Sequence, residues 1–555
     1  MRYSGAEIII KLLERQGIKI IAGIPGGANL PLYNALYKSK IRHILVRHEQ
    51  SAGFIAQGIA RSTGNAAVCF ATSGPGATNL LTAIADAKLD SIPIIAITGQ
   101  VSKGLIGTDA FQEVDTYGMT IPITKHNFLI RNSRELLMVI PEAFRIAASG
   151  RPGPVLIDVP KDVQAETIIF DHWPKNHTPQ KNCKIDEGRI AKIAQMINNS
   201  KRPLMYIGGG IISSGAQNLI SRLAKKNSIP VTSTLMGLGA FNAEDPLYLG
   251  MLGMHARAST NLLMEESDLI ITLGARFDDR ATGYVKHFCR NAKIIHIDID
   301  NAEIDKIKSA HFSLCADIGE ALKRLIPRVE NNKRKGWLFQ IEEKRKAYPL
   351  FTPKDILHPV NIIKTISELV GSEAIITTDV GQHQMWVAQS YPLKKPRTLL
   401  TSGSLGTMGF GLPAAIGAAL ANPKKKIVCI SGDGSILMNI QELATLAELN
   451  LNVTIIIMNN GHLGLVRQQQ EFFYAKRYIA SKFSAKHSFK NIANAFGVEA
   501  FEISSGKKAL SVLEKALSSF KPSLVDINIH HGHNVIPMVR PGKSNKEMIG
   551  GSSNE

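Results

Sequence analysis

The sequence predicts an α/β protein built from three doubly wound parallel-sheet domains. Three observations favour this fold class: short apolar runs end in glycine or a polar loop, amphipathic helical stretches separate those runs, and two polar stretches divide the 555 residues into blocks. At roughly 150 residues per domain, the length suits three or four domains. We expect ligands at the carboxyl ends of the strands, where the loops of such sheets gather.

The first block, residues 1–169, begins with an amphipathic helical segment in which Glu7, Lys11 and Glu14 interrupt the apolar positions. Charges in these positions indicate a soluble helix and not an export signal. The predicted strands each run into a polar or glycine-containing loop, and they cover residues 18–24, 42–46, 66–71 and 92–98. Helical segments are predicted at 50–61 and 77–88.

Two further blocks repeat this alternation. A polar stretch near residues 170–183 is predicted to link the first block to the second, residues 185–328. Its predicted strands cover residues 204–207, 269–273 and 293–297. A charged stretch, 328–355, closes the second block and leads into the third, residues 356–531, with predicted strands at 374–378, 427–430 and 453–458. Residues 532–555 are predicted to form a C-terminal tail.

The composition excludes several classes of protein. Apolar residues make up 44% of the chain and charged residues 20%, which excludes a disordered or collagen-like protein. No apolar run reaches the roughly 18–20 residues that span a bilayer. The five cysteines are far apart without a CxxC pair, so they indicate neither a zinc site nor a disulfide framework. We therefore expect a cytoplasmic protein with no membrane contact.

The formal net charge of +19 allows two interpretations. A basic nucleic-acid-binding protein is one of them, and a salt-dependent shift of labelled DNA would support it. The positive residues are scattered, however, and the short clusters at 333–335 and 424–426 do not alternate with aromatic side chains as a stacking surface would. A solvated basic surface with no nucleic-acid partner is therefore the favoured interpretation.

The most specific local pattern lies in the third block. Asp433 follows one predicted strand in the sequence GDGS, and Asn460 follows the next strand 27 positions later. One strand–helix–strand crossover needs about this length, so both side chains would lie at one sheet edge if the two strands are neighbours. A carboxylate and an amide oxygen suit Mg²⁺, and Gly434 and Ser435 would offer backbone N–H groups to a phosphate. Either turn alone is more often a simple connection, but the pair favours a metal site.

The pair of motifs resembles the thiamin diphosphate (ThDP) motif, in which Asp433, Asn460 and the carbonyl of His462 would hold Mg²⁺. The ThDP family also needs a glutamate from a different domain, and Glu49 in RHEQSAGFIAQGIAR matches it. The resemblance implies that Glu49 hydrogen-bonds N1′ of the aminopyrimidine, so that the cofactor's own 4′-nitrogen removes the thiazolium C2 proton. Taken by itself, Glu49 would be an acidic residue that suits a helix start.

Longer segments resemble the catalytic large subunits of the acetolactate synthase (acetohydroxyacid synthase) family from about residue 3 to residue 549. They include GIPGGANLPLYNAL, ATSGPGATNLLTAIADA, GTDAFQE, RPGPVLIDVPKDVQ, LGMHA, GARFDDRATG, DVGQHQMW and LGTMGFGLPAAIGAAL. The sequences LGLV and RQQQ are similar to the bacterial isozyme-I branch. The resemblance implies a pyrimidine-binding first domain, a central FAD-binding domain and a third domain that binds the diphosphate and Mg²⁺.

This resemblance also implies the candidate site residues. The catalytic candidates are Glu49, Gln112, Lys161 and Arg280, the last as a clamp for the carboxylate of the second 2-oxo acid. The ThDP candidates besides Glu49 are Val380, Gly381, Gln382, His383, Gly406, Met408, Gly434, Ser435, Gly464 and Leu465. The FAD candidates are Arg151, Gly208, Gly209, Gly210, Thr234, Leu235, Met236, Gly253, Met254, His255, Gly274, Arg276, Asp298 and Asp317. Phe111 and Lys125, like Gln112 and Lys161, match residues that line the entrance to the active site. Taken singly, each of these four would be interpreted as a packing or solvated residue.

Two positions depart from the family pattern. Gln469 stands where the family commonly has a tryptophan, whose indole favours the larger acceptor 2-oxobutanoate by apolar contact. The preference between pyruvate and 2-oxobutanoate therefore stays open. Ser102 stands where a proline is usual, which bears on the channel and not on the chemistry.

The resemblance implies an acetolactate synthase of branched-chain amino acid biosynthesis. Such an enzyme decarboxylates pyruvate on ThDP and transfers the hydroxyethyl group to a second pyruvate or to 2-oxobutanoate. FAD would serve structure and not redox turnover. Because Glu49 and Asp433 lie in different blocks, we expect a homodimer or a dimer of dimers, together with a small regulatory subunit.

The alternatives are other ThDP enzymes. A catabolic, FAD-free acetolactate synthase is one, and the GARFDDR segment with Arg280 argues against it. A pyruvate oxidase or decarboxylase is another, and bound flavin without oxygen-dependent turnover would argue against an oxidase.

Overall fold

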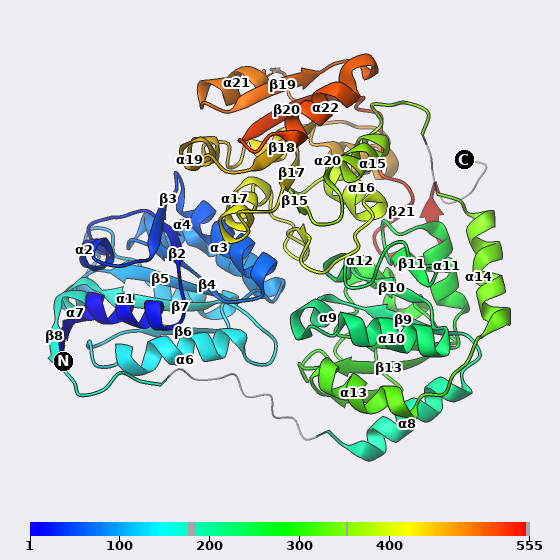
Figure 1. Cartoon of the computed structure of the whole chain (residues 1–555), viewed down its shortest axis with the longest axis horizontal. Coiled ribbons are helices and arrows are strands. Elements are labelled where there is room, and N and C mark those ends of the chain that lie inside the picture. Colours follow the sequence, from blue (N-terminus) through cyan, green and yellow to red (C-terminus); the bar gives the residue numbers. More distant parts are fainter. Residues whose placement is uncertain (176–184, 351–352, 486, 551–555) are drawn as a thin grey trace.

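The computed structural model describes residues 1–175, 185–350, 353–485 and 487–550. It contains three six-stranded sheets, and every neighbouring pair of strands within each of them is parallel. The predicted fold class is confirmed. Figure 1 shows the first domain in blue and cyan beside the third in yellow to red, with the middle domain in green below the third. Part of the predicted linker at 170–183 lies outside the described residues.

The first domain has the strand order β3-β2-β4-β5-β7-β6. Its strands are β2 (Ile20–Gly23), β3 (Arg42–Leu45), β4 (Ala67–Ala71), β5 (Ile94–Gln100), β6 (His126–Leu129) and β7 (Val155–Pro160). Its helices are α1 (Gly5–Arg15), α2 (Leu30–Tyr37), α3 (Glu49–Thr63), α4 (Pro75–Leu89), α5 (Thr116–Thr120), α6 (Leu136–Ala148) and α7 (Lys161–Ala165). A short antiparallel pair, β1 (Arg2–Ser4) and β8 (Thr167–Ile169), joins the two ends of this domain.

Alternation along the buried strands explains why helices cover both faces of this sheet. Val68 and Phe70 of β4 point into one apolar core, and Cys69 and Ala71 point into another. A strand that is apolar on both faces must be covered on both. Helix α1 packs into the first core and α3 into the second. The start of α1 is fixed by a capping box between Ser4 and Glu7.

The middle domain has the order β11-β10-β9-β12-β13-β14. Its strands are β9 (Pro203–Ile207), β10 (Val231–Ser233), β11 (Tyr248–Met251), β12 (Leu269–Leu273), β13 (Lys293–Asp298) and β14 (Phe312–Cys315). Its helices are α8 (Glu187–Asn199), α9 (Gly209–Ser214), α10 (Gln217–Asn227), α11 (Ala258–Glu266), α12 (Asp279–Thr282) and α13 (Ile318–Arg328).

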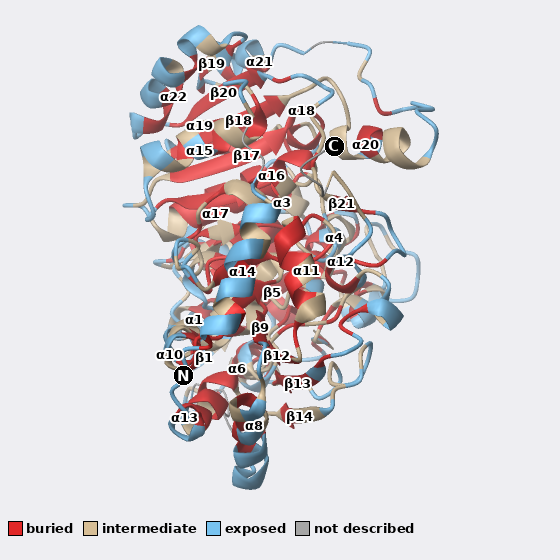
Figure 2. Ribbon diagram, turned by 90° about the vertical axis from the view of Figure 1, so that its right-hand side faces the viewer, coloured by how far each residue is buried: buried red, intermediate tan, exposed pale blue. Residues whose placement is uncertain are grey.

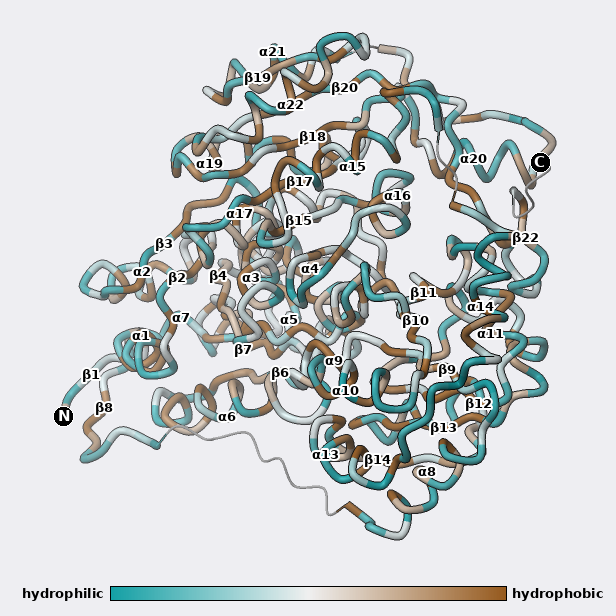
Figure 3. The backbone as a smooth tube through the Cα atoms, turned by 45° about the vertical axis from the view of Figure 1, so that its right-hand side comes forward, coloured by the Kyte–Doolittle hydropathy of each residue, from teal (hydrophilic) through white to brown (hydrophobic). Residues whose placement is uncertain are grey.

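The third domain has the order β16-β15-β17-β18-β20-β19. Its strands are β15 (Ile375–Thr378), β16 (Leu399–Leu400), β17 (Ile427–Gly432), β18 (Val453–Asn459), β19 (Glu499–Ile503) and β20 (Ser523–Asn528). Its helices are α15 (Pro359–Val370), α16 (Gln382–Ser390), α17 (Gly411–Ala421), α18 (Asp433–Ile436), α19 (Glu442–Leu449), α20 (Gly464–Phe473), α21 (Phe489–Ala495) and α22 (Ala509–Ser518). Read in chain order, its strands are arranged as in the first domain. Figure 3 shows the central strands β17 and β18 of this domain coloured as hydrophobic.

Two segments outside the predicted strands and helices pack onto the middle domain. The charged stretch 328–355 contains α14 (Lys335–Ala347), whose Trp337 is 3% exposed and donates its indole N–H to the carbonyl of Pro203 at 3.1 Å. Figure 2 shows α14 on the outside of the molecule, with an exposed outer face. The predicted tail contains β21 (Met538–Val539) and β22 (Met548–Ile549). Its Val539 N–H donates to the carbonyl of Met254 at 2.9 Å.

The crossover between β17 and β18, in which the sequence favours a helical segment at 437–449, is interrupted in the structure. The chain forms the short α18 and then α19, and Asn439 lies between them. The Asn439 side chain donates to the carbonyl of Gly409 at 2.8 Å and accepts from the Ser51 hydroxyl at 3.1 Å. The sequence alone could not predict this break, because both partners lie in segments distant along the chain.

Helices α3 and α17 cross at very short range and join the first domain to the third. A Cβ at Gly58 would lie 2.2 Å from the carbonyl oxygen of Ala414, and one at Gly417 would lie 2.1 Å from that of Ile55. Only glycine allows backbones to approach so closely. Phe54 and Phe410 pack edge to face beside the crossing, with ring centroids 5.4 Å apart. The first and third domains therefore share one apolar core. No helix in the described part of the chain is long and apolar enough to cross a membrane.

Candidate active site

The third sheet changes direction between β15 and β17, because the chain adds β16 on one side and β17 on the other. Open α/β sheets bind ligands at the carboxyl ends of strands at such a switch point. Val380 and Gly381 follow β15, Asp433 follows β17, and Asn460 follows β18. Strands β17 and β18 are parallel neighbours, with Gly432 opposite Met458. The structure therefore brings the two predicted motifs to one sheet edge.

The environment of Asp433 fits a divalent cation. This side chain is 4% exposed, and burial raises its pKa to about 7, although backbone N–H groups such as that of Gly461 act in the opposite direction. No salt bridge found among the described residues includes it. Asn460 lies beside it in a tight turn, in which its Oδ1 accepts from the His462 N–H at 3.0 Å. One carboxylate, one amide and one carbonyl leave half of the positions of an octahedral Mg²⁺ to phosphate and water.

The loops around these residues leave space only for backbone and small groups. A Cβ at Gly464 would lie 2.1 Å from Gln382 Oε1 and 2.6 Å from Asn460 Nδ2. Gly381 has φ 149°, a conformation that favours glycine. Ser435 donates its hydroxyl to the carbonyl of Val380 at 2.7 Å, which joins the loops after β15 and β17. Leu465 lies in the first turn of α20, directly after Gly464.

His383 is a buried polar group without a partner for one of its ring nitrogens. Its side chain is 4% exposed, its Nε2 has no hydrogen-bond partner among the described residues, and burial lowers its pKa to about 3. A neutral imidazole nitrogen in this position is available to a ligand oxygen or nitrogen. It lies in the first turn of α16, next to Gly432, whose Cβ would lie 3.0 Å from the ring.

Asp379, which is not among the predicted site residues, fixes the loop that carries Gly406 and Met408. Its carboxylate accepts from the backbone N–H groups of Gly409 at 2.8 Å and Val380 at 3.0 Å. It is fully buried at the end of β15, and burial raises its pKa to about 6. The signal in the sequence was an acidic residue at the end of an apolar strand, within the quoted DVGQHQMW.

Glu49 occupies the first turn of α3, as predicted. Its Oε2 accepts from the Asn79 side chain at 2.9 Å, and a Cβ at Gly76 would lie 3.5 Å from its Oε1. The neighbouring residues contact the third domain of the same chain: the Gln50 side chain accepts from Asn439 at 3.0 Å. The glutamate is half-buried.

The remaining first-domain candidates do not form one cluster: Phe111 and Gln112 follow β5 and Lys161 follows β7, whereas Lys125 precedes β6 and lies at the opposite edge of the sheet. Phe111 is 87% exposed, and Gln112 has φ 59° with its backbone against Gly74. Lys161 is exposed at the start of α7. Lys125 does not point to an entrance: its ammonium group donates to the carbonyls of Ile146 and Ser149 at the end of α6.

The middle-domain candidates lie at the carboxyl edge of one sheet. Those at Gly208–Gly210 follow β9, those at Thr234–Met236 follow β10, and Gly253, Met254 and His255 follow β11. Gly274 and Arg276 follow β12, Asp298 ends β13, and Asp317 begins α13 after β14. Gly208 and Gly274 sit at the switch point between β9 and β12, where a Cβ at Gly208 would lie 2.2 Å from the carbonyl oxygen of Gly274. The strand order is that of dinucleotide-binding sheets.

Three arginines around this edge have different partners. Arg276 donates to the Ser404 hydroxyl in the third domain at 2.6 Å. Arg151 forms ion pairs with Asp300 at 3.2 Å and Glu303 at 2.7 Å. Arg280 is exposed and lines a cavity of about 440 Å³ together with Met254, Tyr284, Lys286 and Arg540. This cavity lies between the middle domain and the C-terminal tail, and the position of the tail against the middle domain was not predicted from the sequence.

Comparison with known proteins identifies the family. The chain matches the family models for the thiamine pyrophosphate enzyme N-terminal TPP binding domain at residues 3–119, central domain at 190–325 and C-terminal TPP binding domain at 379–527. It is 54% identical over 552 residues to the acetolactate synthase isozyme 1 large subunit of Escherichia coli (strain K12), covering 99% of this chain and 98% of that protein. The chain belongs to the acetolactate synthase large-subunit family.

Two other members of this family show the range of similarity. The acetolactate synthase large subunit of Cyanidium caldarium is 47% identical over 567 residues, covering 99% of this chain and 97% of that protein. The isozyme 2 large subunit of Escherichia coli (strain K12) is 42% identical over 546 residues, covering 98% and 99% of the two chains. The predicted family is therefore confirmed, and this chain is a ThDP-dependent enzyme of the acetolactate synthase type.

Proposed function

We propose that this protein is the catalytic subunit of an acetolactate synthase that joins two 2-oxo acids with loss of CO₂. The donor is pyruvate, and the acceptor is a second pyruvate, giving 2-acetolactate, or 2-oxobutanoate, giving 2-aceto-2-hydroxybutanoate. The observation that carries this proposal is the buried Asp433 next to the half-buried Asn460 at the carboxyl edge of the third sheet, in a chain that matches all three ThDP-enzyme domains. The pathway is branched-chain amino acid biosynthesis, and we propose a cytoplasmic location.

The proposed metal site consists of the Asp433 carboxylate, the Asn460 amide oxygen and the His462 carbonyl. The cation would supply the positive charge that the desolvated carboxylate lacks among the described side chains. Val380, Gly381, Gly434, Ser435, Gly464 and Leu465 would surround the diphosphate, because their backbones close the space around the metal loops. His383 would offer its unpartnered Nε2 to the same ligand.

ThDP when bound supplies a nucleophilic carbon and an electron sink for decarboxylation. Glu49 would hold a proton at N1′ of the aminopyrimidine, and Asn79 would orient the glutamate by donating to its second oxygen. Gly406 and Met408 would contact the pyrimidine and thiazolium region from the loop before α17. Gln112, Lys161 and Arg280 would contact the substrates, with the arginine binding the acceptor carboxylate in bidentate geometry.

We further propose that the middle domain binds FAD. The strand order, the close-packed glycines after β9 and β12 and the arginines nearby support this assignment. The flavin would stabilise the domain and its contacts and take no part in redox turnover. Arg151 would have to leave Asp300 or Glu303 to reach it, since both acids now pair with its guanidinium.

The assembly that we propose is a homodimer, or a dimer of such dimers, with sites shared between subunits. Large apolar side chains are exposed on the first and third domains, in the loops that follow β5, β17 and β18: Phe111, Leu105, Ile121, Met438 and Ile479. Scattered exposed apolar residues are normal, but a set that flanks a site favours burial by another subunit. A separate small regulatory subunit is a further proposed partner, as the family name "large subunit" suggests.

The deciding experiment is an assay of purified protein with pyruvate, ThDP, Mg²⁺ and FAD, in which acetolactate is measured directly. We expect acetolactate without oxygen uptake, and loss of Mg²⁺-dependent ThDP binding in Asp433→Ala by calorimetry. Acetaldehyde or hydrogen peroxide as the sole product would instead indicate a decarboxylase or an oxidase. Full activity without bound flavin would favour the catabolic, FAD-free type.

A further inference from the structure

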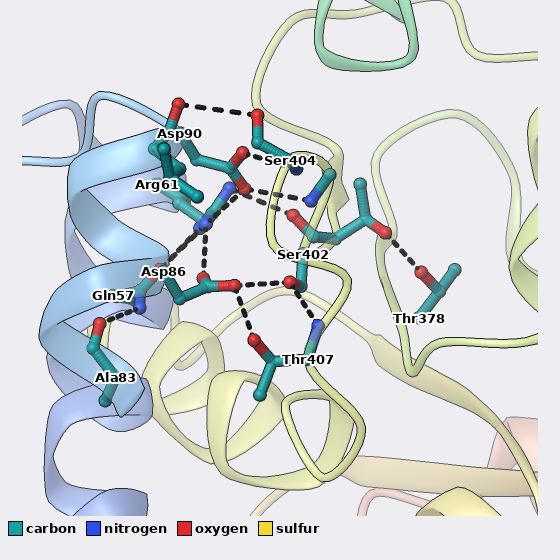
Figure 4. A network of polar contacts seen from close by, with 12 residues as sticks. Gln57, Arg61, Ala83, Asp86, Asp90, Thr378, Ser402, Ser404 and Thr407 are labelled. Carbon is teal, nitrogen blue, oxygen red and sulfur yellow. Dashed lines mark hydrogen bonds and ion pairs between the residues drawn. The ribbon is translucent and has the colours of Figure 1, made fainter. Parts of the chain in front are cut away.

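A buried polar network connects the first domain to the loop that precedes α17. Its core is a guanidinium group between two carboxylates: Arg61 Nη2 lies 3.2 Å from Asp86 Oδ2 and 2.9 Å from Asp90 Oδ2. We call these three residues the carboxylate bracket. Their side chains are 5%, 0% and 0% exposed. Arg61 lies on α3, Asp86 on α4 and Asp90 directly after α4, and Figure 4 shows them facing the loop that holds Ser402 and Thr407.

The two carboxylates face a single guanidinium group, and burial raises the pKa of Asp86. Their oxygens therefore need further hydrogen-bond donors, because they are shielded from water. The loop supplies them. Asp90 accepts from the backbone N–H groups of Gly403 at 2.9 Å and Ser404 at 2.8 Å. Asp86 accepts from the hydroxyls of Ser402 and of Thr407, the latter at 3.0 Å. A different loop conformation would leave buried carboxylate oxygens without donors.

Arg61 contacts the same loop directly and is itself held in place. It donates to the carbonyl of Thr401 at 3.0 Å, while Gln57 accepts from its Nε at 3.1 Å and its Nη2 at 2.7 Å. Its guanidinium carbon also lies 5.0 Å from the ring centre of Phe410. The arginine therefore binds the start of the loop, and the two aspartates bind its middle.

The loop is also fixed from inside the third domain and touched by the middle domain. Ser402 accepts from the Thr407 N–H at 2.8 Å, which closes the loop on itself, and Asp379 holds Gly409 just beyond it. Arg276 donates to Ser404, and a Cβ at Gly403 would lie 2.3 Å from the sulfur of Met236. All three domains of one chain thus meet on residues 401–409, which include Gly406 and Met408.

We propose that the carboxylate bracket is a positioning element for the cofactor: Asp86, Asp90 and Arg61 hold residues 401–408 in the conformation that receives ThDP. This inference rests on the proposed function. The bracket touches neither substrate nor cofactor candidates, and it acts through the loop. Pre-organising a loop increases affinity because less conformational entropy is lost on binding, so the bracket sets ThDP affinity and turnover more than pyruvate affinity.

Thr407 offers the sharpest test, because its hydroxyl can be removed without disturbing the arginine. Thr407→Val removes the donor to Asp86 and keeps the shape, whereas Thr407→Ser keeps the hydroxyl and serves as the conservative rescue. We expect Thr407→Val to weaken ThDP binding in calorimetry by about tenfold, since a hydrogen bond to a charged group is lost, and to lower kcat. The KM for pyruvate should change by less than about threefold, and Thr407→Ser should resemble the wild type.

Asp90→Asn is a second, stronger perturbation, and Glu142→Gln on α6 is its matched control, since Glu142 pairs with Arg145 away from the loop. We expect Asp90→Asn to weaken ThDP binding at least as much as Thr407→Val, and Glu142→Gln to leave it unchanged. Thermal unfolding without cofactor reports folding separately. Wild-type ThDP affinity in both Thr407→Val and Asp90→Asn would overturn the bracket proposal while the proposed function stands. A wild-type protein that binds no ThDP would overturn both.

Discussion

The close crossing of α3 and α17 gives a prediction whose size follows from the structure. In Gly417→Ala the new Cβ would lie 2.1 Å from the carbonyl oxygen of Ile55, whereas ordinary contacts begin at 3.4 Å. The helices must therefore separate by roughly 1.3 Å, because the obstacle is backbone and cannot rotate away. Overpacking of this kind costs up to about 3 kcal/mol, and alanine returns about 1 kcal/mol of helix propensity, so we expect a net loss of about 2 kcal/mol.

The matched control is Gly336→Ala in the first turn of α14. In the described part of the chain nothing lies within 4 Å of a Cβ at this position, so the same substitution should be neutral or stabilising by up to about 1 kcal/mol. Equilibrium urea unfolding measures the free energy of unfolding of both variants. Acetolactate production should fall by up to about 100-fold in Gly417→Ala, because a shift of about 1 Å moves Glu49 relative to the loop before α17. Equal stability and activity in the two variants would refute the close crossing.

Three other predictions concern single side chains. Glu49→Gln should keep ThDP bound in calorimetry but lower kcat by about 10²–10⁴-fold, since a proton position is lost; near-normal turnover would exclude that role. Gln469→Trp should raise the share of 2-aceto-2-hydroxybutanoate when pyruvate and 2-oxobutanoate compete, because an indole adds apolar contact for the larger acceptor, and an unchanged product ratio would contradict this. Burial raises the pKa of Asp158 from 3.8 to about 7, so the folded state retains a proton that the unfolded state loses, and stability should fall as pH rises from about 4 to 7. Asp158→Asn should remove this pH dependence, so that the change in the free energy of unfolding between about pH 4 and pH 7 becomes smaller by up to about 4 kcal/mol. An unchanged dependence on pH would contradict the prediction.

The sequence predicted the elements whose signal is local. Apolar runs such as 269–273 coincide with β12, and the loops after β17 and β18 lie together as their spacing required. Contacts between segments that are distant along the chain could not be predicted from local sequence patterns. Asp86 and Asp90 read as ordinary polar positions on a helix, because their partners, Ser402 to Thr407, lie more than 300 residues away. Helix α14 was not predicted because its sequence is rich in charged residues, and only Trp337 and Ile341 of that helix are buried.

The shared core of α3 and α17 has a consequence for synthesis on the ribosome. Residues Ala52, Ile55 and Ala56 of α3 bury their side chains with Ile416 and Ala419 of α17. Roughly 350 residues separate the two helices, which at about 5–20 residues per second corresponds to about 20–70 s of translation. Throughout that interval the nascent first domain presents an apolar helix face whose partner does not yet exist. Chaperone demand should therefore be greatest before the last third of the polypeptide emerges.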